Sequence, residues 1–149
     1  MSLCWRLRET DKYVLKRLQS VQNCAARLIN LSRKYEHVTP LLISLHWIPV
    51  QERIKFKILI ITFKVLHGQA PPYIFNLLEP YCPARTLCSS NRNLLYKPVF
   101  NLKTYGGRSF SIAAPTLWNI LPTTIKNSSS LDSFKRRLKT LLFNKAFFS

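Results

Sequence analysis

The chain has 149 residues, of which 23 are Lys or Arg and six are Asp or Glu, and its formal net charge is +17. The apolar fraction of 47% excludes wholesale disorder, and a globular chain of this length buries roughly two-thirds of its unfolded surface. A single-sign excess of this size repels itself unless a polyanion is near, so nucleic acid is the first partner class to consider and an anionic membrane surface the second.

Membrane insertion and secretion are not expected. No stretch reaches the roughly 20 apolar residues of a membrane span, and residues 1–12 lack the apolar core of a signal peptide. The cysteines form no C-x-x-C pair and follow no zinc-binding spacing; they are Cys4, Cys24, Cys82 and Cys88. We therefore expect an intracellular chain, in the nucleus or the cytoplasm, with reduced thiols.

The first predicted helix covers residues 11–30, with Asp11 as its N-cap. Its apolar residues recur at alternating steps of four and three, which places Val14, Leu18, Val21, Ala25 and Leu28 on one stripe. Two interpretations remain open: the stripe packs on the core of the same chain, or it packs on a partner domain.

The most apolar part of the chain is residues 37–78. A short helix opens here with Thr39 as N-cap and Pro40 at the first helical position. The longest helical pattern follows at about residues 50–67, and its apolar stripe consists of Val50, Ile54, Ile58, Ile61 and Val65. Further apolar residues widen this stripe, so we expect a central helix that other helices cover on more than one side.

Residues 72–78 predict a helix of one to two turns, and a polar loop follows at residues 81–93. Residues 94–96 and 99–103 are candidate short strands, so a loop or minor β-hairpin is expected at about residues 81–105. Gly106 and Gly107 indicate a turn, and a glycine pair alone does not form a phosphate-binding loop.

The C-terminal part predicts two more helical regions. Residues 109–121 are expected to form a helix in two parts that meet at Pro115. Residues 126–130 are a predicted connector whose last residue, Ser130, N-caps the final helix. The buried stripe of that helix is predicted to consist of Leu131, Phe134, Leu138, Leu141 and Leu142.

These elements predict a mostly all-α fold. We expect a frayed N-terminus at residues 1–10, a single compact helical domain at residues 11–145 around the central helix, and a tail at residues 146–149.

No catalytic constellation is visible in the sequence. The six acids are scattered, and His37, His46 and His67 have no histidine four residues away and no carboxylate cluster nearby. Neither a nucleotide-binding loop nor a G-x-S-x-G elbow is present. We expect no catalytic residue, no metal and no cofactor in this chain.

The basic residues instead indicate contacts to phosphates. The first candidate patch is on the final helix and consists of Lys135, Arg136, Arg137 and Lys139. The second is near the N-terminus and consists of Lys12, Lys16 and Arg17, together with Arg6 and Arg8. The alternative for either patch is an ordinary solvated helix face.

Four stretches resemble a known family when taken in this order and spacing. They are RLQSVQNCAARLI (residues 17–29), the segment 37–78 with LHWIPV and APPYI, LKTYGGRSFSIAAPTLWNILP (102–122) and SLDSFKRRLKTLLF (130–143). The combination resembles the C-terminal region of the second open reading frame of jockey-like, non-LTR (LINE-type) retrotransposons. One departure is Gly107, where relatives usually carry an acid.

The resemblance implies a function for the full-length parent rather than for this chain alone. The family protein is an RNA-directed DNA polymerase, usually with an N-terminal endonuclease, and its catalytic aspartates lie upstream of this region. No Asp-Asp pair occurs here. The resemblance implies a non-catalytic region that packs on the polymerase thumb and helps to hold template RNA or target DNA.

Overall fold

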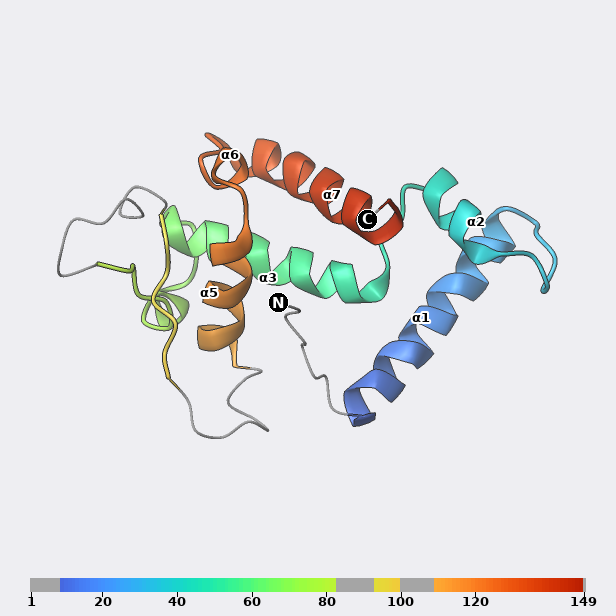
Figure 1. The fold of residues 1–149 in the computed structure, drawn as a ribbon, viewed down its shortest axis with the longest axis horizontal. Helices are drawn as coiled ribbons and strands as arrows, with labels where there is room; N and C mark the ends of the chain where they lie inside the picture. Colours follow the sequence, from blue (N-terminus) through green and yellow to red (C-terminus); the bar gives the residue numbers. More distant parts are fainter. Residues whose placement is uncertain (1–8, 83–92, 100–108, 149) are drawn as a thin grey trace. The chain divides into compact units, whose positions relative to one another are not determined.

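The computed structural model describes residues 9–82, 93–99 and 109–148. These residues form helices and contain no strand. The helices are α1 (Glu9–Ile29), α2 (Val38–Ser44), α3 (Val50–Leu66), α4 (Pro72–Phe75), α5 (Phe110–Ile120), α6 (Thr123–Lys126) and α7 (Leu131–Phe147) (Figure 1). The predicted mostly all-α fold is therefore confirmed.

The predicted loop or hairpin at residues 81–105 is described only in part. Pro80 and Leu95 form an isolated antiparallel bridge. Residues 83–92 and 100–108 lie outside the described residues, and with them most of the second candidate strand and the turn at Gly106 and Gly107.

The chain divides into two compact units, and each is described in turn. Unit 1 comprises Met1–Ile54 and Leu141–Ser149, and unit 2 comprises Lys55–Thr140. The expectation of one domain at residues 11–145 stays a prediction. Helical structure begins at Glu9 and extends to Phe147, so both ends of the helical region reach beyond their predicted limits.

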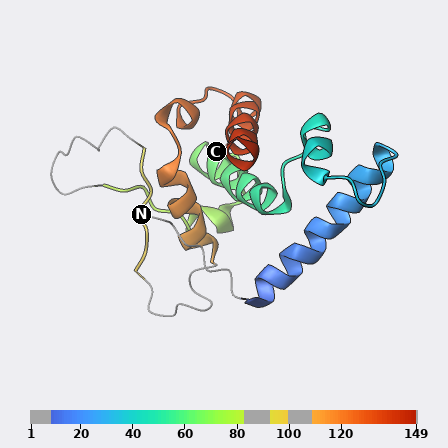
Figure 2. The same cartoon turned by 45° about the vertical axis from the view of Figure 1, so that its right-hand side comes forward.

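In unit 1, α1 lies beside α2 in both views (Figures 1 and 2). Two side-chain amides attach α1 to the turn that precedes α3. Gln22 Nε2 donates to the Ile48 carbonyl at 3.0 Å, and Gln19 Oε1 accepts the Val50 N–H at 2.9 Å. Val50 is the first residue of α3, so this N–H has no partner inside the helix. Gln19 therefore satisfies one of the orphan donors of α3.

Of the two interpretations of the α1 stripe, packing on the core of the same chain is wrong. The buried residues of α1 are Gln22 and Ala26, whereas most of the predicted stripe is exposed: Val14 by 50%, Leu18 by 49%, Val21 by 67% and Leu28 by 77%. The physical reason is that the two glutamine contacts turn a different face of the helix toward the Ile48–Val50 turn. Periodicity identified the apolar face correctly but not the face that packs.

Two predicted helix starts are also corrected. Asp11 lies inside α1 rather than at its N-cap. The N-cap of α2 is His37, so Pro40 is its third residue and not its first. Proline is tolerated there because the N–H groups of the first turn have no intrahelical acceptor.

In unit 2, an aromatic cluster from three helices forms the centre of the core. Phe63 of α3 stacks on Phe134 of α7 with ring centroids 4.3 Å apart, and Trp118 of α5 lies 6.0 Å from Phe134. All three side chains are buried. Figures 1 and 2 show α5 beside α3.

The bounds of α3 agree with the predicted central helix within one residue, but its buried face differs. The buried residues are Leu59, Thr62, Phe63 and Val65, whereas Ile54 is 44% exposed. The Thr62 hydroxyl is satisfied within the helix, since Oγ1 donates to the Ile58 carbonyl at 2.9 Å. The helix is apolar on most sides, so periodicity alone did not select the deepest face.

The helices after residue 109 differ from the predicted ones at two places and agree at a third. α5 runs without a break through Pro115, so the predicted two-part helix is wrong. The short helix α6 was not predicted, and it makes Lys126 helical and buried rather than part of a connector. The predicted N-cap of α7 is confirmed, because Ser130 Oγ accepts the Ser133 N–H at 3.2 Å.

Candidate nucleic-acid interface

The solvent face of α7 carries three of the four predicted phosphate-binding residues. α7 buries Phe134 and Leu138, and this fixes which side of the helix faces outward. Arg136, Arg137 and Lys139 are exposed, and Lys135 is half-buried at the edge of the outward side. Residues three or four apart on a helix have Cβ atoms about 5–6 Å apart, so Lys139 is a neighbour of both Lys135 and Arg136.

Asp132 reduces the charge of this α7 patch. Lys135 Nζ lies 3.0 Å from Asp132 Oδ1, and both side chains are substantially exposed. Such a surface pair is weak, at about 0–1 kcal/mol. The side chains of Arg136 and Lys139 have no hydrogen bond or ion pair with another of the residues that the structure describes. They are the strongest candidates for phosphate contacts on α7.

Arg137 does not belong to the same cluster. Its NH1 group donates to the Thr124 carbonyl of α6 at 2.9 Å. The guanidinium group is thereby turned toward α6, away from the face that Arg136 and Lys139 share. Arg137 contributes charge to the region, but its side chain is already engaged in holding α6 to α7.

The second predicted patch lies on α1, in the other compact unit. Lys12, Lys16 and Arg17 are all exposed. Lys12 and Lys16 are one turn apart, and the Arg17 guanidinium lies 5.7 Å from the centroid of the Tyr13 ring, a cation–π distance. Arg6 and Arg8 lie outside the described residues. The α1 and α7 patches are therefore two separate candidates.

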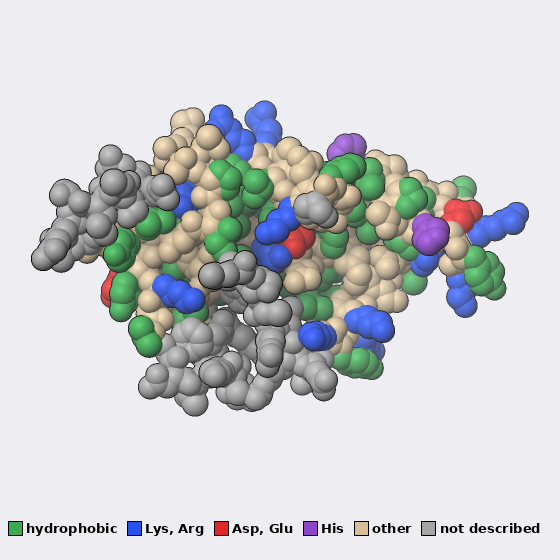
Figure 3. All heavy atoms as spheres, viewed as in Figure 1, with side chains coloured by type: hydrophobic (Ala, Val, Ile, Leu, Met, Phe, Trp, Pro, Cys, Tyr) green, Lys and Arg blue, Asp and Glu red, His purple; other side chains and the backbone are tan. Residues whose placement is uncertain are grey.

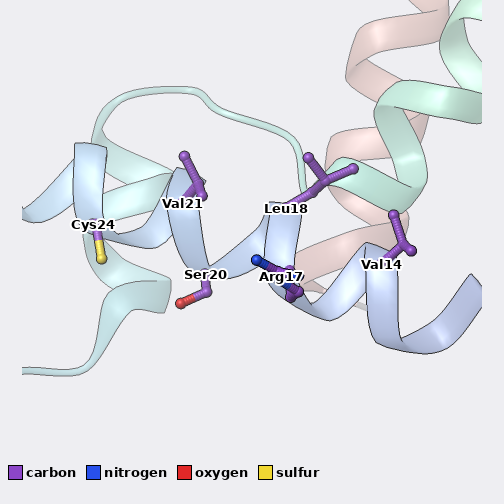
Figure 4. Close-up of a pocket in the computed structure, with 6 residues that line it drawn as sticks. All are labelled: Val14, Arg17, Leu18, Ser20, Val21 and Cys24. Carbon is purple, nitrogen blue, oxygen red and sulfur yellow. The ribbon is translucent and has the colours of Figure 1, made fainter.

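Arg17 also borders an apolar hollow on the surface of α1. The described residues that line it come from this one helix: Val14, Arg17, Leu18, Ser20, Val21 and Cys24. Figure 4 shows Val14, Leu18 and Val21 projecting from the same side of the helix. Helical periodicity groups the apolar residues of this hollow but does not show that an exposed cation, Arg17, borders them.

Other exposed cations add to the positive surface. Lys57 of α3 and Lys97 of the segment 93–99 are exposed in unit 2. On the face shown in Figure 3, Lys and Arg side chains (blue) are more frequent than Asp and Glu side chains (red). The arrangement suits non-specific neutralisation of a phosphate backbone better than a shaped pocket for one small anion.

The described His and Cys residues form no cluster of possible metal ligands. Among the described residues there is no group of three or more His, Cys, Asp or Glu residues that could hold a metal ion. His67 has a structural role, since its Nδ1 lies 2.9 Å from the Phe63 carbonyl and its ring stacks on Phe63. Cys24 and Cys82 are free and exposed.

None of the described helices has the length and apolar content needed to cross a bilayer. Comparisons with known proteins found no matching family model, no matching curated protein and no matching solved structure.

Proposed function

We propose that the chain is the post-polymerase, C-terminal region of a jockey-like non-LTR retrotransposon protein, and that it acts as a non-catalytic module in the nucleus or cytoplasm. In this role its basic side chains contact the phosphate backbone of template RNA or target DNA. The observation that carries the proposal is the α7 cluster of Lys135, Arg136 and Lys139 in a chain of net charge +17.

Two features of the cluster support phosphate binding. Arg136 and Lys139 have no protein partner among the described residues, so they pay no cost of breaking an ion pair when they bind. Lysine and arginine on a convex helix face neutralise phosphates without reading base edges, so the expected binding is independent of sequence and depends steeply on salt.

The test is a fluorescence-anisotropy titration of the chain against labelled single-stranded RNA and duplex DNA at several salt concentrations. The test variant is Arg136→Glu/Lys139→Glu. The matched control is Arg33→Glu/Lys34→Glu, which changes the net charge equally at exposed residues between α1 and α2. We expect the α7 variant to lower the salt slope on duplex DNA by about 1.8, since each lost phosphate contact removes about 0.9. Equal slopes for variant and control would reject the assignment to α7.

A second function is favoured by the exposed apolar stripe of α1. We propose as the alternative that the chain is a structural segment that packs on an upstream polymerase domain and has no independent activity. The exposed side chains of Val14, Leu18, Val21 and Leu28 support this alternative, because unpaired apolar patches mark interaction surfaces. Sedimentation velocity at high salt, which screens the repulsion between copies, tests it: self-association that Leu18→Gln/Val21→Gln abolishes supports it, and a monomer that also binds no partner helix argues against it.

A further inference from the structure

The exposed stripe of α1 has the spacing of a coiled-coil seam. Val14, Leu18, Val21, Ala25 and Leu28 follow steps of four, three, four and three, so in a heptad Leu18 and Ala25 occupy a positions and the other three occupy d positions. A strict a/d stripe is narrower than the apolar face of an ordinary core-facing helix. Its length from Val14 to Leu28 is about 21 Å at 1.5 Å per residue.

The two sides of this seam differ. On the e side, Gln22 is buried and bonded to the Ile48 carbonyl, so that flank is already occupied by unit 1 itself. On the g side, Arg17 and Cys24 are exposed and border the hollow beside Val14, Leu18 and Val21 (Figure 4). The uncovered part of the seam therefore consists of the a and d residues and the flank at Arg17.

The charge beside the seam determines the chemistry of that partner. Within the described part of the chain, Arg17 has the Tyr13 ring as its contact and no carboxylate. Lys16 and Lys12 are exposed on the same helix. A second copy of this chain also has a net charge of +17, so the two copies would repel each other. A helix with carboxylates at its e and g positions would instead pair with Arg17.

We infer that α1 docks an acidic amphipathic helix of a partner protein, which places apolar side chains over the seam and a carboxylate beside Arg17. This inference rests on the interaction role proposed above and deepens it by naming the chemistry of the partner. The narrow seam, occupied on one flank, favours a helix over a lipid surface, which binds a broad apolar face.

The test uses the full chain and three synthetic peptides of equal length. The first is a helical peptide with Leu at a and d and Glu at e and g; the second has the same composition in scrambled order; the third carries Lys in place of the e and g Glu. Vesicles with equal parts phosphatidylserine and phosphatidylcholine form a fourth probe. Binding is measured by anisotropy for the peptides and by co-sedimentation for the vesicles.

We expect the acidic amphipathic peptide to bind at least about tenfold more tightly than its scrambled form, and Leu18→Gln/Val21→Gln to remove this difference. Both substituted side chains are exposed, so folding is retained. Arg17→Glu is expected to weaken binding of the Glu peptide and to strengthen binding of the Lys peptide. A matched control is Val99→Gln/Ile120→Gln, which removes two exposed apolar side chains outside α1.

Each other outcome overturns the inference. If the scrambled peptide binds as tightly as the amphipathic one, the net charge of the chain and not the seam attracts acidic peptides. Vesicle binding that depends on Leu18 and Val21, without peptide binding, assigns the stripe to a membrane surface. Self-association that depends on the stripe, without peptide binding, retains the interaction role but rejects the acidic partner. A monomer that binds no probe rejects both proposals.

Discussion

Asn119 holds the backbone of Leu95 at both of its polar groups. Its Oδ1 accepts the Leu95 N–H and its Nδ2 donates to the Leu95 carbonyl, each at 2.9 Å. On the opposite edge, the neighbouring residues Leu94 and Tyr96 bond to the backbone of residues 79–81. The Asn119 side chain of α5 therefore makes the two hydrogen bonds to Leu95 that the backbone of a neighbouring strand would otherwise make.

We predict that Asn119→Leu destabilises the protein by about 2 to 6 kcal/mol. Leu95 is buried, and the substitution leaves two of its backbone groups without partners, at about 1–3 kcal/mol each. Urea unfolding followed by circular dichroism measures the change. Asn144→Leu, at an exposed site on α7, is the control and should shift stability by less than about 0.5 kcal/mol. Equal effects of the two substitutions would contradict the role given to Asn119.

A second prediction concerns Gln19, whose side chain accepts the first N–H of α3. Gln19→Ala should cost about 1 kcal/mol, the usual loss when a capping acceptor at a helix N-terminus is removed. Gln19→Glu keeps the acceptor and adds negative charge near the positive end of α3, so it should retain most of the stability. Thermal unfolding of both variants tests this, with Ser20→Ala as the control. Equal losses of stability for Gln19→Ala and Gln19→Glu would show that the side-chain oxygen of residue 19 does not stabilise the start of α3.

The aromatic cluster of unit 2 gives a third prediction. Phe134 is fully buried and lies between Phe63 and Trp118, so Phe134→Ala should cost about 3–5 kcal/mol. Phe134→Leu retains more of the packing and keeps the prediction testable if the Ala variant does not fold. Near-UV circular dichroism and urea unfolding are the measurements. Phe148→Ala, at a side chain that is 71% exposed, should leave stability within about 0.5 kcal/mol.

Thr62 supplies a fourth prediction with two opposite substitutions. Its hydroxyl bonds to a carbonyl of its own helix, so Thr62→Val removes a buried polar group without leaving another residue unpaired. We expect Thr62→Val to change stability by less than about 1 kcal/mol. Thr62→Ser keeps the hydroxyl but removes a buried methyl group, and should cost about 1 kcal/mol. Guanidinium unfolding measures both, and a larger loss for Val than for Ser would contradict the prediction.

Local chemistry explains which helices the sequence could predict. The limits of α3 follow from Pro49 before it and Gly68 after it, and the start of α7 follows from the Ser130 cap. The short helix α6 could not be found in this way. Its four residues are too few to show a period, and they stand between Pro122 and Asn127, which resemble a connector.

The packing of α1 and the role of Arg137 could not be predicted, because both depend on residues distant in sequence. Gln22 bonds to Ile48, 26 residues away, and this contact selects the buried face of α1. Arg137 bonds to Thr124 in a helix that the sequence did not reveal. For the candidate site, helical spacing was sufficient to group Lys135, Arg136 and Lys139, since that grouping depends on one helix alone.

The way in which α1 is attached has a consequence for its motion. Among the described apolar side chains of α1, Ala26 is the one that is deeply buried, and hydrogen bonds from Gln19 and Gln22 add to the attachment of the helix. A helix that buries so little apolar surface opens locally at a lower free energy than a core helix such as α3. The backbone N–H groups of α1 should therefore exchange with solvent faster than those of α3. A partner bound over the seam should slow this exchange along the whole helix.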